Sequence, residues 1–262
     1  MTNLLRIHLC LAALLASLCL IAPGASAQAQ TQGPIKNIVL VHGAWADGSS
    51  WDRVIPLLLA KGFHVVSAQH PLSSIADDVA ATNRIVDAQD GPVLLVGHSY
   101  GGAVITEAGN NAKVAGLVYV AAFAPDEGET LSGLAGRFPK PPVYDEVRPI
   151  ADGYLLVTAK GINEDVAPDM SQAERDLLLA TQGATQSAVL QTPITKAAWH
   201  SKPAWFVIAA NDRVIAPEQE ASTAKRMGAK TLTVKTSHVA MLVAPIEVAN
   251  FIAEAASSLS SK

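Results

Sequence analysis

Six short apolar runs alternate with longer segments of helical period along most of this chain. The runs are rich in Val, Ile or Leu and lack clean in-out alternation, which is typical of strands buried on both faces. Such strand–helix alternation predicts a mostly parallel sheet flanked by helices, and 262 residues can bury that core as one domain. The expected strands are residues 37–43, 63–69, 92–98, 115–122, 204–211 and 230–236.

Several helices of this α/β fold, which we expect over residues 36–262, have recognisable ends. Ser74 stands where an N-cap is expected, directly before a segment of helical period. Ser171 and Glu174 have the spacing of a capping box at another helix start. Pro56 interrupts a third helical segment, which predicts a helix that is kinked or begins late.

The alternation is interrupted at about residues 124–200. This stretch begins with a segment dense in Gly and Pro and continues into a segment of helical period. Apolar side chains such as Leu155, Leu156 and Leu178 need burial, which argues against a disordered linker between two domains, the alternative interpretation. We expect a helical lid inserted between two strands of the core.

The first residues have the pattern of a signal peptide. Arg6 precedes an apolar run over residues 9–22, and a small-x-small cleavage pattern ends at Ala27. The run is shorter than the roughly 20 residues of a membrane-spanning helix, so we expect no stable membrane anchor. We predict a cleaved leader over residues 1–27, a disordered lead-in over residues 28–35, and an exported protein, periplasmic or secreted.

Charge and composition exclude several kinds of partner. The formal net charge is −4 and no Lys/Arg cluster occurs, so the sequence predicts no nucleic-acid partner. The two cysteines, Cys10 and Cys19, lie within the predicted leader, and no histidine pair has the spacing of a zinc-binding helix. We therefore expect no metal, no cofactor and a small neutral substrate.

A G-x-S-x-G motif joins the expected strand at residues 92–98 to a helical segment. Its central residue is Ser99, flanked by Gly97 and Gly101. A serine on such a sharp strand-to-helix turn has a strained backbone, and side chains at the flanking positions would collide with neighbouring elements. The motif predicts a nucleophilic serine exposed at the carboxyl edge of the sheet.

A serine nucleophile needs a general base and an acid that orients it. In this kind of sheet the order along the chain is Ser, Asp or Glu, His, and only His200 and His238 follow Ser99. His238 directly follows a strand, whereas His200 ends the insertion, so His238 is the predicted base. Asp212 also follows a strand directly and is the predicted acid, with Asp126 as the alternative.

The expected oxyanion hole consists of two backbone amides. One is the amide of Tyr100 after the serine, and the other is the amide of Ala44 in the loop after the first strand. Trp45 lies beside that loop, and Met241 and Leu242 closely follow His238. We assign these three residues to the substrate pocket, with core packing as the alternative role for each.

The chain resembles an α/β-hydrolase, and within that superfamily the small lidded esterases related to plant methylesterases and hydroxynitrile lyases. The resemblance implies that Ser99, Asp212 and His238 form the catalytic triad and that the amides of Ala44 and Tyr100 form the oxyanion hole. The matching stretches are VHGAWADGSSW, VGHSYGG, NDRVIAPE and SHVAMLVAPIEVA.

Two departures from hydroxynitrile lyases bear on the reaction. Those enzymes carry Thr at the position of Gly43 and Lys at the position of Val239, where a lysine helps to hold a cyanide leaving group. Dehalogenase and epoxide hydrolase relatives have a carboxylate at the nucleophile position, where this chain has Ser99. The resemblance therefore favours ester hydrolysis.

Together these features predict an exported serine hydrolase that cleaves small or medium carboxylic esters through an acyl-enzyme on Ser99. Three related reactions on the same site remain alternatives: lactone hydrolysis, acyl transfer and cofactor-free carbon–carbon cleavage. A ligand receptor that retains the fold without catalysis is an alternative from another class.

Overall fold

The structure is a computed structural model that describes residues 35–259. The predicted leader at residues 1–27, and all of the predicted lead-in except its last residue, lie outside this range. That last residue, Ile35, is buried and packs in the core. The packed domain therefore extends at least one residue further toward the N-terminus than the sequence predicted.

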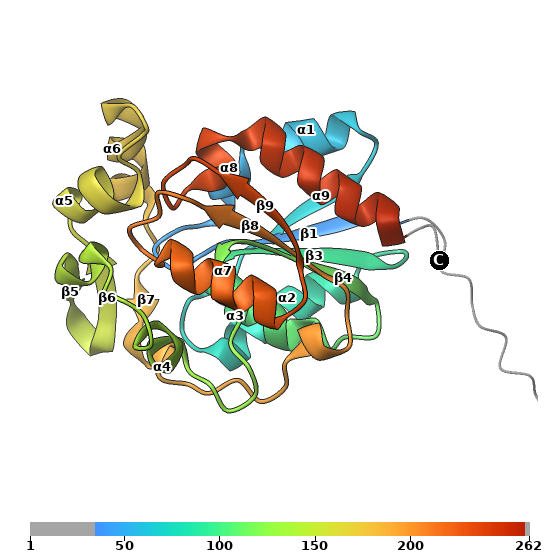
Figure 1. Cartoon of the computed structure of the whole chain (residues 1–262), viewed down its shortest axis with the longest axis horizontal. Helices are drawn as coiled ribbons and strands as arrows, with labels where there is room; N and C mark the ends of the chain where they lie inside the picture. Colours follow the sequence, from blue (N-terminus) through green and yellow to red (C-terminus); the bar gives the residue numbers. More distant parts are fainter. Residues whose placement is uncertain (1–34, 260–262) are drawn as a thin grey trace, which may run out of the picture. The chain divides into compact units, whose positions relative to one another are not determined.

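A six-stranded parallel sheet forms the centre of the domain (Figure 1). All six strands expected from the sequence are present, so the predicted fold class is confirmed. Every neighbouring pair in this sheet is parallel. In spatial order the strands are β2 (His64–Ala68), β1 (Asn37–Val41), β3 (Val93–Ser99), β4 (Val114–Ala122), β8 (Ala204–Ala209) and β9 (Lys230–Val234).

Alternate residues of each central strand enter two separate cores. In β1, Val39 and Val41 face one core, whereas Ile38 and Leu40 face the other, and all four side chains are fully buried. This explains why the strands show no in-out alternation of polar and apolar residues.

Helices cover both faces of the sheet (Figure 1). None of the helices within residues 35–259 has the length and apolar character of a membrane span. The first core lies under α2 (Ile75–Asp87), α3 (Tyr100–Ala108) and α7 (Pro217–Arg226), and the second under α1 (Ile55–Ala60), α8 (Ala240–Val243) and α9 (Pro245–Leu259).

The helix boundaries follow the predicted signals. The Ser74 side chain accepts a hydrogen bond from a backbone N–H in the first turn of α2. α1 begins at Ile55 with Pro56 in its first turn, after a separate 3₁₀ turn at Gly48–Trp51, so this helix begins late rather than being kinked. Ser171 caps α6 (Gln172–Thr181) with a complete capping box.

The insertion between β4 and β8, residues 124–200, is only partly helical, which corrects the expectation of a helical lid. Besides α6 it holds two short helices and a three-stranded antiparallel sheet, in the order β5-β6-β7. Asp152 and Gly153, both at positive φ, form the turn that lets β6 fold back on β5. These elements are α4 (Leu131–Ala135), α5 (Ala159–Gly161), β5 (Val147–Pro149), β6 (Tyr154–Val157) and β7 (Thr185–Gln186).

Irregular turns complete the insertion. A π-helical segment follows α5 directly, and the others are 3₁₀ turns. They are Pro142–Asp145, Ala151–Gly153, Ile162–Val166 (the π segment), Ser187–Leu190 and Ala198–His200.

Loops at the carboxyl edge of the main sheet hold the insertion through polar contacts. Trp45, which follows β1, donates its indole N–H to the Leu155 carbonyl at 3.0 Å and its backbone N–H to Thr185 Oγ1 at 3.1 Å. Ser237, which follows β9, donates both its N–H and its hydroxyl to the Asp169 carboxylate, at 2.7 and 2.6 Å. The insertion is thus tied to the edge where the predicted catalytic residues lie.

Candidate active site

Ser99 ends β3 in a strained conformation, with φ 52° and ψ −122°. The flanking glycines are required by close approach of the backbone. A Cβ at Gly97 would lie 2.5 Å from the Gly101 carbonyl oxygen, and one at Gly101 would lie 2.5 Å from the His42 carbonyl oxygen. The steric reason inferred from the motif therefore applies: the bend leaves no room for a side chain at either glycine position.

Asp212 and His238 are joined by a hydrogen bond. His238 Nδ1 lies 2.6 Å from Asp212 Oδ2, and both side chains are buried. The other carboxylate oxygen, Oδ1, accepts the backbone N–H groups of Val214 at 2.6 Å and Ile215 at 2.9 Å. With its proton on Nδ1, the imidazole presents Nε2 as a proton acceptor.

His98 links the turn that carries Ser99 to the loop that carries His238. Its Nε2 donates to the His238 carbonyl oxygen at 3.0 Å, and the two ring centres are 4.7 Å apart. Burial lowers the pKa of His98 well below its usual value, so this ring is neutral and has a structural role. Among residues 35–259, the Ser99 hydroxyl has no hydrogen-bond partner, so the contact with His238 Nε2 that proton transfer needs is not formed in this structure.

The two predicted oxyanion donors are also available. Tyr100 begins α3, where the first amides of a helix have no partner within it. Among the described residues, neither its amide nor that of Ala44 donates to another protein group. The next amide in the loop, that of Trp45, is occupied by Thr185 Oγ1. Ala44 is thus the better donor of these two loop residues.

Two adjacent cavities open at these residues. One encloses about 490 Å³, counting its opening to solvent, and the predicted pocket residues Trp45, Met241 and Leu242 line it together with His238. The other measures about 370 Å³, again counting its opening to solvent, and is lined by Ser99. Ser99 and His238 therefore face neighbouring spaces at the carboxyl edge of the sheet.

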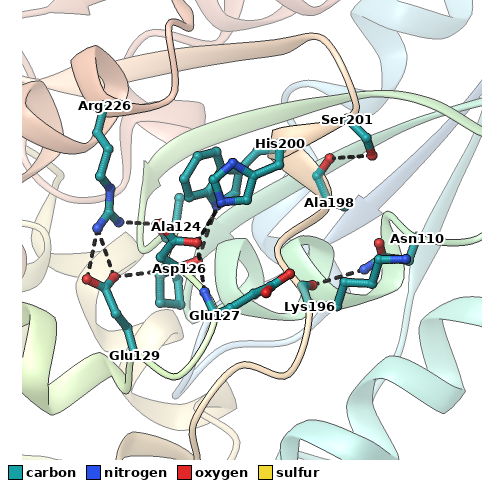
Figure 2. A network of polar contacts seen from close by, with 12 residues as sticks. Asn110, Ala124, Asp126, Glu127, Glu129, Lys196, Ala198, His200, Ser201 and Arg226 are labelled. Atoms are coloured by element: carbon teal, nitrogen blue, oxygen red, sulfur yellow. Dashed lines mark hydrogen bonds and ion pairs between the residues drawn. The ribbon is translucent and has the colours of Figure 1, made fainter.

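The alternative acid and base, Asp126 and His200, pair with each other instead (Figure 2). His200 Nε2 lies 2.7 Å from Asp126 Oδ1, and the His200 side chain is more than half exposed. Arg226 donates to both oxygens of Glu129 at 2.9 Å and lies over the Trp199 ring. This surface network joins the two ends of the insertion, and no serine of the described part of the chain hydrogen-bonds to its Asp–His pair.

A buried carboxyl group that the sequence analysis did not single out lies behind Asp212. Glu220 on α7 is fully buried, and its Oε2 accepts the Ala209 N–H at 3.0 Å. Burial, and next the negative charge of Asp212, raise the pKa of Glu220 well above its usual value. The sequence does contain one indication of this burial. Glu220 lies four residues before Ala224, so both residues are on the face of α7 that packs against the core.

Replacing Glu220 by Gln is expected to increase stability more at pH 8 than at pH 4. Because the folded-state pKa is raised, the folded protein holds a proton that the unfolded chain releases above its own, lower pKa. The free energy of unfolding therefore falls as the pH rises from the pKa of Glu220 in the unfolded chain toward its pKa in the folded protein. Gln has no proton to lose and removes this fall, while its amide oxygen still accepts the Ala209 N–H.

Urea unfolding at the two pH values measures this difference. Glu218→Gln makes the same chemical change on the exposed face of the same helix and is the matched control. An equal effect of the two variants would contradict a neutral Glu220.

Comparisons with known proteins identify the family of this chain. Residues 38–251 match the model of the alpha/beta hydrolase family. A carbendazim hydrolyzing esterase of Nocardioides sp. is 33% identical over 123 residues, which are 41% of this chain and 50% of the relative. A pyrethroid hydrolase of Sphingobium wenxiniae is 31% identical over 144 residues, 45% of this chain and 49% of the relative. The aligned part thus spans about half of each relative.

Among solved structures, a methylesterase from Arabidopsis superposes with a TM-score of 0.70 at 18% identity, covering 84% of this chain and 98% of that one. At this identity the likeness shows the fold. The resemblance inferred from the sequence motifs is confirmed. Because the family model covers most of the chain, from β1 into α9, this protein belongs to the alpha/beta hydrolase family.

Proposed function

We propose that this protein hydrolyses carboxylic esters through an acyl-enzyme on Ser99, with His238 as general base and Asp212 as its orienting acid. The observation that carries the proposal is the buried 2.6 Å bond between Asp212 and His238 Nδ1, at the same edge of the sheet as the strained Ser99. The mechanism also requires Ser99 Oγ and His238 Nε2 to come within hydrogen-bond distance when the substrate binds.

The reaction follows from these positions. His238 Nε2 takes the Ser99 proton as Ser99 Oγ attacks the ester carbonyl, and Asp212 stabilises the resulting imidazolium. The amides of Ala44 and Tyr100 donate to the oxyanion of the tetrahedral intermediate. His238 then returns the proton to the departing alcohol, and a water molecule, activated by the same imidazole, releases the acid.

Two residues favour ester hydrolysis over cyanohydrin cleavage. Val239 follows the base and provides no cation for a cyanide leaving group. A Cβ at Gly43 would lie 2.9 Å from the Ser99 Cβ, so the Thr of the lyases would crowd the serine in this chain. The names of the two curated relatives, an esterase and a hydrolase, are consistent with this choice.

The proposal includes export, with cleavage of the leader after Ala27. Its support is the sequence pattern alone: a basic residue, a short apolar run and small residues before the cleavage point.

Labelling with an organophosphonate, which reacts with activated serines, tests the proposed function. We expect one phosphonate per chain, located on Ser99 by peptide mass spectrometry, with parallel loss of activity on a panel of ester substrates. Absence of labelling, together with tight binding of a small molecule, would support the receptor alternative and contradict the proposal.

A further inference from the structure

Two chambers flank the candidate catalytic residues. We define the His238 chamber by its lining residues Val157, Ile162, Leu178, His238, Met241 and Leu242. We define the Ser99 chamber by Ser99, Phe123, Leu131, Val143, Tyr144 and Leu190. Ala44, Trp45 and Val214 line both, so the chambers meet beside the predicted oxyanion loop.

We infer that the His238 chamber takes the alcohol part of the substrate and the Ser99 chamber the acyl part, so that the substrate is an uncharged ester with an apolar group on each side. This inference rests on the proposed function and specifies its substrate class.

The direction of proton transfer assigns the two chambers. When Ser99 Oγ bonds to the carbonyl carbon, the bond from that carbon to the alcohol oxygen must break, and the proton held by His238 goes to that oxygen. The leaving oxygen therefore lies within hydrogen-bond reach of the imidazole, and the alcohol carbons beyond it enter the His238 chamber.

The acyl part extends in the other direction. Its carbonyl oxygen lies between the amides of Ala44 and Tyr100, and its carbon is bonded to Ser99. Ser99 and Tyr100 line the second chamber, whereas His238 does not. The acyl chain is thus directed toward Phe123 and Leu131.

The chemistry of the walls excludes charged substrates. Among residues 35–259, no Lys, Arg, Asp or Glu lines either chamber, and most lining residues are apolar. A charge on either side of the ester would therefore lose its hydration without a compensating partner. The acid product ionises after hydrolysis, so the same walls favour its release.

A matched pair of substitutions tests the assignment. Leu178 on α6 and Leu190 are both partly buried leucines of the insertion, one in each chamber. Each is replaced by Trp, and kcat/KM is measured on two ester series: acetate esters of increasing alcohol length, and ethyl esters of increasing acyl length. Urea unfolding checks that both variants fold, and Leu178→Ala and Leu190→Ala replace any that do not.

The expected result is a crossover. Leu178→Trp lowers kcat/KM for long alcohols by about tenfold or more and leaves the acyl series near the wild-type values, whereas Leu190→Trp does the converse. Leu178→Ala is expected to extend the length of alcohol that is accepted, and Leu190→Ala the length of acyl chain. A reversed crossover, or equal effects on both series, overturns the assignment while leaving ester hydrolysis intact. Failure of the wild type on every ester overturns the proposed function itself.

Discussion

Replacing Ser99 by Ala is expected to lower kcat by about 10⁶, because the group that forms the covalent intermediate is lost. The variant keeps a Cβ at φ 52°, so the strained bend, the flanking glycines and the packing of α3 are unchanged. Stability in urea is expected to stay close to that of the wild type, since the hydroxyl makes no hydrogen bond within residues 35–259. Single-turnover and steady-state assays on the best ester measure the loss.

The matched control is Ser201→Ala. Ser201 is exposed and its hydroxyl donates to the Ala198 carbonyl at the end of the insertion, so its removal is expected to leave kcat unchanged. Purified Ser99→Ala that retained ester hydrolysis above the background of a mock preparation would contradict the nucleophile assignment.

The core of this fold was predictable because its signals are local. Each central strand is buried on both faces, so runs such as residues 37–41 carry few polar residues, and their short length and β-branched residues distinguish them from helical segments. The turn at Ser99 was equally predictable. Gly97 and Gly101 are required there because backbone atoms approach within 2.5 Å of where a Cβ would lie.

The insertion was less predictable for a physical reason. Its strands are two to four residues long, too short to show a periodicity, and α5, the π-helical segment and α6 all lie between β6 and its partner β7 in the chain. Its placement depends on contacts distant in sequence, such as the bond from the Trp45 indole to the Leu155 carbonyl, 110 residues apart. Contacts between residues so far apart in the chain cannot be predicted from a local sequence pattern.

The choice between candidate acids shows the same limit within the site. Asp126 and Asp212 both follow strands, and sequence alone ranked them by position in the chain. In the structure the distinction is made by partners: Asp126 contacts exposed His200, whereas Asp212 contacts buried His238. The burial of Glu220 was not predicted because a glutamate on a helix is usually exposed to solvent, and only tertiary packing buries this one.

Asp212→Asn is expected to lower kcat by about 10⁴ by placing the His238 proton on the wrong nitrogen. Asp212 Oδ1 accepts two backbone N–H groups, from Val214 and Ile215, so an amide at this position must keep its oxygen there. Its NH₂ group then replaces Oδ2 and donates to His238 Nδ1. The imidazole must carry its proton on Nε2, which can no longer accept the proton of Ser99.

Asp126→Asn is the matched control, because it makes the same chemical change at the alternative acid. It weakens the contact with His200 at the end of the insertion and is expected to leave kcat within about twofold of the wild type, as for a surface ion pair. Steady-state kinetics of the two variants across pH 5–9 separate the assignments. Should Asp126→Asn lose activity while Asp212→Asn retains it, the acid would act through His200, and the buried pair would have only a structural role.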